Sequence, residues 1–398
     1  MIGLSIVIPA YNEEDGIAEI ANRVLAVKGD LAKAGVTLTE LLVVDDGSRD
    51  RTAEVASKIE GVTLIRHPKN KGYGGALKTG FNAAQGELVG FLDADGTYPP
   101  EYFPQLCQAA FRGADLVIGS RMAGAESKMP PMRRLGNIFF AGLLSLITNQ
   151  RVTDSASGMR VFKREKLAQM YPLPNGLNLT PVMSTRAIHE GIAITEVAIP
   201  YSERVGRSKL SVIHDGRVFL ESMLWTALSY NPVSVLGKIG LGGVVLAVLA
   251  VAVLVGARLS GVTNLGVAEV AGLFAAMLAG VIGVSIFALG VTFNYLVSLF
   301  YEKPVRQGLF GKPIFKTPLE RHFGWMGVLA TLGGLIGGGV FAALSFNGWD
   351  VTRLWLYLMG SAMLTIVGVQ LLIYWVLVKV LDELRARDVL ARKDLGLD

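Results

Sequence analysis

The chain has 398 residues, of which 51% are hydrophobic and 18% charged, and a net charge of +5. Its mean hydropathy of +0.45 excludes an ordinary soluble domain, and its charged residues exclude a protein that lies wholly in a membrane. The single cysteine, Cys107, excludes an internal disulfide and suits a reducing compartment. No signal peptide is expected, because the first residues lack a basic region before a long apolar run. Nucleic-acid binding is not expected either, because no basic patch is interleaved with aromatic residues.

The first half alternates short apolar runs with helical stretches. Runs rich in Val, Ile and Leu, typical of buried strands, lie at residues 4–9, 40–44, 62–66, 88–92 and 115–119. Helical segments near 13–33, 51–58 and 74–84 separate the first four. This order predicts an α/β fold with a mostly parallel, doubly wound sheet, which binds ligands at the carboxyl ends of its strands.

Two amphipathic stretches follow, at residues 132–148 and 210–230. Each is typical of a core helix or of a helix lying at a membrane surface, and the nearby apolar runs favour the surface. Four runs are long enough to cross a bilayer: 235–255, 270–299, 325–344 and 354–381. The predicted domains are therefore 1–210, a soluble α/β domain, 211–233, an interfacial helix or linker, and 234–398, a transmembrane domain of four helices with a C-terminal tail.

The charges between the apolar runs predict an orientation. Five basic residues lie between the second and third runs and four in the C-terminal tail, namely Lys303, Arg306, Lys312, Lys316, Arg321, Arg385, Arg387, Arg392 and Lys393. The other two connections carry only Arg258 and Arg353 as basic residues. The soluble domain and the C-terminus are thus expected in the cytoplasm. The runs themselves hold almost no ionisable residue, which disfavours a channel or carrier.

Acidic pairs follow two of the predicted strands. Asp93 and Asp95 end an apolar strand before a glycine, and such carboxylates suit Mg²⁺ or Mn²⁺ bound beside a diphosphate; the alternative is an ordinary turn. Asp45 and Asp46 end the second strand, and for Asp46 the preferred interpretation is a cap on the next helix together with Ser48. A stretch rich in glycine, Gly72-Tyr73-Gly74-Gly75, is interpreted as a tight turn into a helix.

Groups suited to a nucleotide and to phosphates complete the predicted site. Pro9, Tyr11 and Glu13 end the first strand with an aromatic ring and an acceptor. The basic groups are Arg121, at a strand end, Arg133 and Arg134, and then Arg204, Arg207 and Lys209. Arginine binds phosphate through paired hydrogen bonds. For Arg134 and Arg207 a position at the bilayer surface is the preferred alternative.

These motifs together resemble a known family. They occur in the order Pro9-x-Tyr11-x-Glu13, Asp45-Asp46-Gly47-Ser48, Asp93-x-Asp95, Gly119-Ser120-Arg121, Asp154-x-x-Ser157-Gly158-x-Arg160 and Gly206-x-Ser208-Lys209-Leu210. The first 210 residues resemble family 2 glycosyltransferases of the GT-A fold, and more closely the dolichol-phosphate mannose synthases and related polyprenyl-phosphate glycosyltransferases. Where many relatives follow the acid pair with Leu-Gln, this chain has Gly96-Thr97, so the resemblance does not extend a metal-ligand role to Thr97.

The resemblance implies a role for each matching position. Donor contacts are implied for Pro9, Tyr11, Glu13, Val43, Asp45, Asp93, Ala94, Arg204 and Lys209. Metal binding is implied for Asp93 and Asp95, contact with the acceptor phosphate for Arg121, Arg133 and Ser157, and a catalytic part for Asp95, Arg121, Arg133 and Asp154. Asp154 is expected to orient Arg133 or Arg160, with action as a base as the alternative.

The implied reaction is a metal-dependent, inverting transfer of a hexose, mannose foremost, from GDP-mannose or UDP-glucose to dolichyl or undecaprenyl phosphate at a membrane. An acceptor phosphate is already ionised near pH 7 and needs no strong base. The alternatives are transfer of glucose or another sugar, a polysaccharide synthase with a hydroxyl acceptor, whose usual Gln-x-x-Arg-Trp motif is missing here, and a nucleotide-sugar-binding membrane regulator. A homo-oligomer is also compatible with the sequence.

Overall fold

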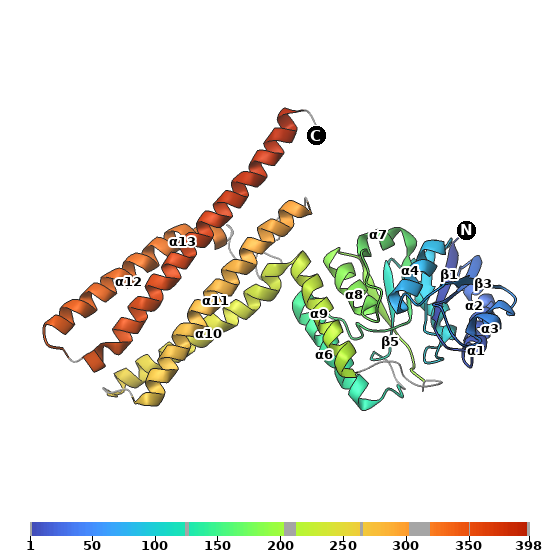
Figure 1. The fold of residues 1–398 in the computed structure, drawn as a ribbon, viewed down its shortest axis with the longest axis horizontal. Coiled ribbons are helices and arrows are strands. Elements are labelled where there is room, and N and C mark those ends of the chain that lie inside the picture. The colour runs from blue at the N-terminus through green and yellow to red at the C-terminus, as the bar shows by residue number, and fades with distance from the viewer. Residues whose placement is uncertain are drawn as a thin grey trace. The chain divides into compact units, whose positions relative to one another are not determined.

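The computed structural model describes residues 2–123, 127–202, 212–262, 266–301, 319–349 and 351–395. The chain divides into two compact units, Met1–Ala227 and Leu228–Asp398. The first is an α/β unit built on one sheet, and the second is built of long helices (Figure 1).

The first unit contains a seven-stranded sheet in the order β3-β2-β1-β4-β6-β5-β7. Its strands are β1 (Gly3–Ala10), β2 (Leu38–Asp45), β3 (Val62–Arg66), β4 (Leu88–Phe91), β5 (Leu116–Ser120), β6 (Arg160–Lys163) and β7 (Ile194–Ala198). All neighbours pair in parallel except β6, which runs antiparallel to both β4 and β5. The predicted mostly parallel α/β sheet is confirmed, and β6 and β7 are additions that the sequence did not predict.

Helices cover both faces of this sheet. They are α1 (Ile17–Ala26), α2 (Lys28–Lys33), α3 (Thr52–Ser57), α4 (Tyr73–Ala83), α5 (Phe103–Phe111), α7 (Leu167–Met170) and α8 (Leu179–His189), with short 3-10 turns at Pro100–Tyr102 and Arg164–Lys166. Alternate side chains of β1 enter two separate cores: Ile6 packs with residues of α1 and α5, and Val7 with residues of α4 and α8. Burial on both faces explains why the strands are almost continuously apolar.

Two further helices of the first unit pack against each other, α6 (Pro131–Thr148) and α9 (Val212–Tyr230). The rings of Phe140 and Phe219 lie 5.8 Å apart, centroid to centroid, and Leu144 and Met223 are buried beside them, as the adjacent ribbons in Figure 1 show. Beyond Arg134, the outward face of α6 is largely apolar, and its exposed large hydrophobic side chains are Met132, Leu135, Ile138, Phe139 and Leu146. An exposed apolar face of this extent is typical of a surface that meets a partner or a membrane.

The second unit consists of α10 (Pro232–Leu259), α11 (Val267–Phe300), α12 (Phe323–Phe346) and α13 (Val351–Asp394), with a 3-10 turn at Leu319–His322. The stretches long and apolar enough to cross a membrane are Pro232–Leu259, Val267–Phe300, Glu320–Phe346 and Tyr357–Leu384, which confirms the predicted four. Glycines bring paired helices close: a Cβ on Gly240 would lie 2.5 Å from the carbonyl oxygen of Gly283, and one on Gly334 2.3 Å from Thr365 Oγ1. The glycine-rich stretch of α12 therefore packs, at Gly334, against α13 of the same chain.

Candidate active site

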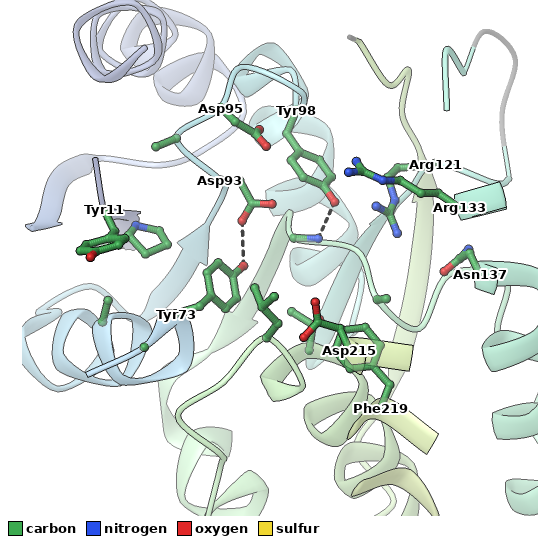
Figure 2. Close-up of a pocket in the computed structure, with 18 of the residues that line it drawn as sticks. Tyr11, Tyr73, Asp93, Asp95, Tyr98, Arg121, Arg133, Asn137, Asp215 and Phe219 are labelled. Atoms are coloured by element: carbon green, nitrogen blue, oxygen red, sulfur yellow. Dashed lines mark hydrogen bonds between the residues drawn. The ribbon is translucent and has the colours of Figure 1, made fainter. Parts of the chain in front are cut away.

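A cavity of about 570 Å³ opens at the carboxyl ends of the strands. Side chains that follow β1, β4 and β5 line it together with the first turns of α4 and α6 and with α9. Its size is that of a pocket for a small ligand, and its position is the one expected for an α/β sheet. Figure 2 shows Asp93 and Asp95 on one side of this cavity and Arg121 and Arg133 on another.

The acidic side is formed by the turn after β4. Asp93 accepts a hydrogen bond from the Tyr73 hydroxyl at 2.8 Å, and a Cβ on Gly158 would lie only 2.5 Å from Asp93 Oδ2. Asp95 Oδ1 accepts hydrogen bonds from the backbone N–H and the hydroxyl of Thr97, at 3.1 and 2.6 Å. Both carboxylates line the cavity. The two hydrogen bonds from Thr97 thus hold the Asp95 carboxylate in place.

This pair of acids fits a hard divalent ion that takes its other ligands from a substrate. No group of three or more His, Cys, Asp or Glu side chains suited to a metal occurs among the described residues, so an all-protein cage is not formed there. Mg²⁺ is usually bound through one or two carboxylates plus phosphate oxygens and water. Two carboxylates on the wall of an open cavity supply that donor set.

The basic side centres on Arg121, which follows β5. Its Nε and Nη2 donate to the two oxygens of Asp154, each at 2.7 Å, and its backbone N–H donates to Asp154 Oδ2 at 3.0 Å. Its guanidinium also lies over the rings of Tyr98 and Tyr201, at 5.8 and 5.4 Å from their centroids. Burial alone would lower the pKa of Arg121, but the charge and hydrogen bonds of Asp154, together with the nearby Tyr98 and Tyr201, outweigh burial and raise the pKa well above its ordinary value. Arg121 is therefore a fixed, permanently charged group at the cavity.

Asp154 orients Arg121, an arginine other than the Arg133 or Arg160 expected from the sequence. Asp154 is fully buried, and its carboxylate pairs with Arg121. Its own N–H donates to Glu196 on β7 at 3.0 Å, which fixes the turn that carries it. Neither β7 nor its glutamate was predicted from the sequence.

Arg160 supports the same turn from inside the protein. It is fully buried and donates to the carbonyl oxygens of Ser155 and Ser157 and to the Ser184 hydroxyl, at 2.8, 3.0 and 2.9 Å. Burial lowers its pKa to about 10. The Ser157 hydroxyl is also turned inward, where it donates to the Gly119 carbonyl at 2.6 Å. The position of Ser157 therefore gives no support to its predicted contact with an acceptor phosphate.

The structure brings most of the other predicted site residues together. Those that line the cavity are Pro9, Tyr11, Glu13, Asp93, Ala94, Asp95, Arg121 and Arg133. Val43 is instead buried in the core. Asp45 is also buried: it accepts from the Ser48 N–H at 3.2 Å, and Arg66 Nε lies 3.2 Å from its Oδ2 without hydrogen-bond alignment. Neither lines the cavity, and Arg204 and Lys209 lie outside the described residues.

The first unit matches the model of a known family, described as glycosyl transferase family 2, over residues 5–170. A dolichyl-phosphate hexose transferase of Haloferax volcanii is 34% identical over 225 residues, which cover 56% of this chain and 94% of that relative. The chain belongs to glycosyl transferase family 2.

The names of other relatives of this glycosyltransferase indicate transfer of different sugars. An undecaprenyl-phosphate 4-deoxy-4-formamido-L-arabinose transferase of Edwardsiella ictaluri is 30% identical over 243 residues, 60% of this chain and 71% of the relative. A dolichol-phosphate mannosyltransferase of Pyrococcus furiosus is 31% identical over 215 residues, 52% of this chain and 59% of the relative. Residues 232–392 match a second model, described as a domain of unknown function, DUF8752.

Several residues of the glycosyltransferase cavity were not predicted from the sequence. They are Asp46, Tyr73, Tyr98, Asn137, Tyr201, Asp215 and Phe219, all lining it. The predicted helix-capping role of Asp46 is wrong, because its oxygens accept from the N–H groups of Lys71 and Gly72 at 2.8 and 2.9 Å. Asp215 and Phe219 lie on α9, which the sequence indicated only as an interfacial helix or linker.

Proposed function

We propose that this glycosyltransferase moves a hexosyl group from a nucleotide diphosphate sugar to a polyprenyl phosphate, with Mg²⁺ or Mn²⁺, and so forms a lipid-linked sugar. The observation that carries the proposal is the arrangement of one cavity, with two carboxylates on one wall and a fixed arginine on another. Such a cavity suits two phosphate-bearing substrates that must meet. The names of the relatives support the lipid acceptor.

The donor occupies the side of the cavity lined by Tyr11, Asp93 and Asp95. The ring of Tyr11 offers a flat apolar surface for stacking against a nucleobase. Asp93 and Asp95 would hold a divalent ion, which when bound would neutralise charge on the departing diphosphate. Thr97 and Tyr73 hold these carboxylates through the hydrogen bonds described above, so the acids need little reorganisation when the donor binds.

The acceptor phosphate binds at Arg121, and Arg133 on the first turn of α6 adds a second guanidinium on the same side of the cavity (Figure 2). Arg121 cannot turn away easily, because Asp154 holds two of its nitrogens. A phosphate oxygen ionised near pH 7 attacks the anomeric carbon as the nucleoside diphosphate leaves from the opposite face, which inverts the configuration. Alignment and fixed charge, rather than a strong base, then account for the rate.

The isoprenoid chain runs along the apolar side of α6. Met132, Gly136 and Phe140 of this helix line the cavity, while Leu135 and Phe139 are exposed on its outer face. A helix with its basic first turn at the cavity and an apolar outer face is suited to the boundary between headgroups and acyl chains. This helix, the four apolar helices and the basic connections described above support a proposed topology. In it, the chain crosses the membrane several times, and the catalytic unit and the C-terminus face the cytoplasm.

Mannose, carried by GDP, is the proposed sugar. It rests on the resemblance to mannose synthases and on the mannosyltransferase among the relatives.

A panel of donors tests the proposal. Purified full chain is incubated with labelled GDP-mannose, UDP-glucose and other nucleotide sugars, with Mg²⁺ or Mn²⁺, and with either a polyprenyl phosphate or a free oligosaccharide. The proposal predicts an organic-extractable labelled lipid with one donor, abolished by EDTA. Labelled polysaccharide without a lipid product would instead identify a polysaccharide synthase, and no product from any donor would favour a nucleotide-sugar-binding regulator.

A further inference from the structure

Tyr73 links the glycine-rich turn to the acidic wall. It is the first residue of α4, its hydroxyl donates to Asp93 Oδ1 at 2.8 Å, and Figure 2 shows the ring directed at that carboxylate. Because a carboxylate oxygen can only accept, the Tyr73 hydroxyl is the donor in this hydrogen bond.

The backbone that carries Tyr73 is held from two sides. On one side, Asp46 accepts the N–H groups of Lys71 and Gly72, and His67 Nδ1 lies 2.7 Å from the same carboxylate. On the other side, a Cβ on Gly72 would lie 2.5 Å from the carbonyl oxygen of Asn175. Gly72 also has a φ of +88°, a conformation that glycine adopts without strain. The turn therefore has a fixed shape and sets the position of the Tyr73 ring.

Asp93 is confined on its far side as well. A Cβ on Gly158 would approach Asp93 Oδ2 to 2.5 Å, so any larger residue at this position would require the carboxylate to shift. The N–H of Gly158 donates to the Tyr98 hydroxyl at 2.7 Å, which fixes Gly158 in turn. With Tyr73 on one oxygen and the Gly158 backbone beside the other, Asp93 has few orientations open to it.

We propose that Tyr73 is a positioning residue that holds the carboxylate of Asp93, through Oδ1, in the orientation that binds the divalent ion. In Figure 2 the other carboxylate oxygen is turned away from Tyr73. Groups that hydrogen-bond to a metal ligand fix its orientation, and removing one typically lowers metal affinity by roughly 10- to 100-fold. This inference rests on the proposed metal-dependent transfer and adds the residue that orients its ligand.

The test compares Tyr73→Phe with Tyr171→Phe in the full chain. The Tyr171 hydroxyl is a buried group without a hydrogen-bond partner, so its removal is a matched loss of one buried oxygen from the same unit. Free Mn²⁺ is measured by electron paramagnetic resonance during titration of each protein in the presence of GDP or UDP. The dissociation constant for Mn²⁺ is expected to rise roughly 10- to 100-fold in Tyr73→Phe and to stay unchanged in Tyr171→Phe.

Two further outcomes separate the inference from the function on which it rests. If the unmodified chain binds Mn²⁺ and Tyr73→Phe binds it equally well, the positioning role is refuted while the metal-dependent transfer stands. If the unmodified chain binds no Mn²⁺ with either nucleotide, the metal-dependent function itself fails, and the inference with it. Recovery of sugar transfer by Tyr73→Phe at high Mn²⁺ would add support, because a variant that had merely lost its fold would not recover.

Discussion

Replacing Asp154 by Asn should destabilise the catalytic unit strongly. The substitution keeps the size of the side chain but removes the negative charge that pairs with Arg121 through two contacts of 2.7 Å. Asp154 has no exposed surface, and the Arg121 side chain is only 12% exposed. The variant therefore leaves an arginine charge largely buried without its counterion.

The expected loss follows from that burial. Removing one partner of a buried ion pair costs about 3–5 kcal/mol, because the remaining charge stays desolvated. For a unit of this length, 1 kcal/mol shifts the melting temperature by roughly 2–4 °C, so the catalytic unit of Asp154→Asn should melt roughly 6–20 °C lower. Asp115→Asn is the matched control: Asp115 also pairs with one basic residue, Lys163, at 2.7 Å, but both side chains are partly exposed. Such a pair contributes less than about 1 kcal/mol.

The single cysteine provides an assay that reports on this unit alone. Cys107 lies in the core of the catalytic unit and is fully buried, so a dye that fluoresces on reaction with a thiol reports its exposure as the detergent-solubilised full chain is heated. The reasoning predicts a much earlier transition for Asp154→Asn than for Asp115→Asn. Equal melting temperatures for the two variants would show that the Arg121–Asp154 pair contributes no more to stability than a surface pair. That result would refute the reasoning from burial.

Three other expectations can be checked with the same preparations. Burial raises the pKa of Cys107 to about 12, so iodoacetamide at pH 8 should leave the folded chain unmodified and label it only after denaturation; rapid labelling of the folded chain would contradict the buried position. Arg133→Ala should raise the KM for polyprenyl phosphate roughly 10- to 100-fold, since a hydrogen bond to a charged group contributes about 1.5–3 kcal/mol. Nucleotide binding measured by calorimetry should stay unchanged. Weaker nucleotide binding would instead show that Arg133 contacts the donor. Leu135→Asp, on the exposed face of α6, should lower transfer to a long-chain acceptor in liposomes several-fold but not transfer to a short-chain acceptor in detergent, and an equal loss with both would argue against contact of α6 with lipid.

The elements that the sequence predicted well are those with strong, uninterrupted patterns. The strands near Ile6 and Phe91 are buried on both faces, so their apolar runs were visible. β6 was not predicted because it has four residues and begins with a charged one, Arg160. β7 has only five residues, Ile194–Ala198, and its polar residues Thr195 and Glu196 are adjacent, so it shows neither a continuous apolar run nor a regular alternation. The four long apolar helices could be predicted from the length and composition of their apolar runs alone.

Some residues of the site could be predicted from the sequence and others could not. Asp93, Asp95 and Arg121 follow strands that could be recognised, so their convergence followed from the topology. The partner of Asp154 could not be predicted, because the turn that carries it is fixed by Glu196 from the unpredicted β7. Tyr73 was visible in the glycine-rich stretch, but nothing local to that stretch shows that its hydroxyl reaches Asp93, 20 positions away. Long-range hydrogen bonds of this kind depend on the assembled sheet.

The most direct test of the account is the rate of lipid-linked sugar formation by Asp95→Asn, measured with the donor that the unmodified chain accepts. Asn keeps an oxygen able to accept the two hydrogen bonds from Thr97, so the variant should melt close to the unmodified chain in the Cys107 assay. It loses the charge proposed to hold the divalent ion, and transfer should fall by at least about 100-fold. A folded Asp95→Asn chain that transfers sugar at the full rate would contradict the role of the aspartate pair.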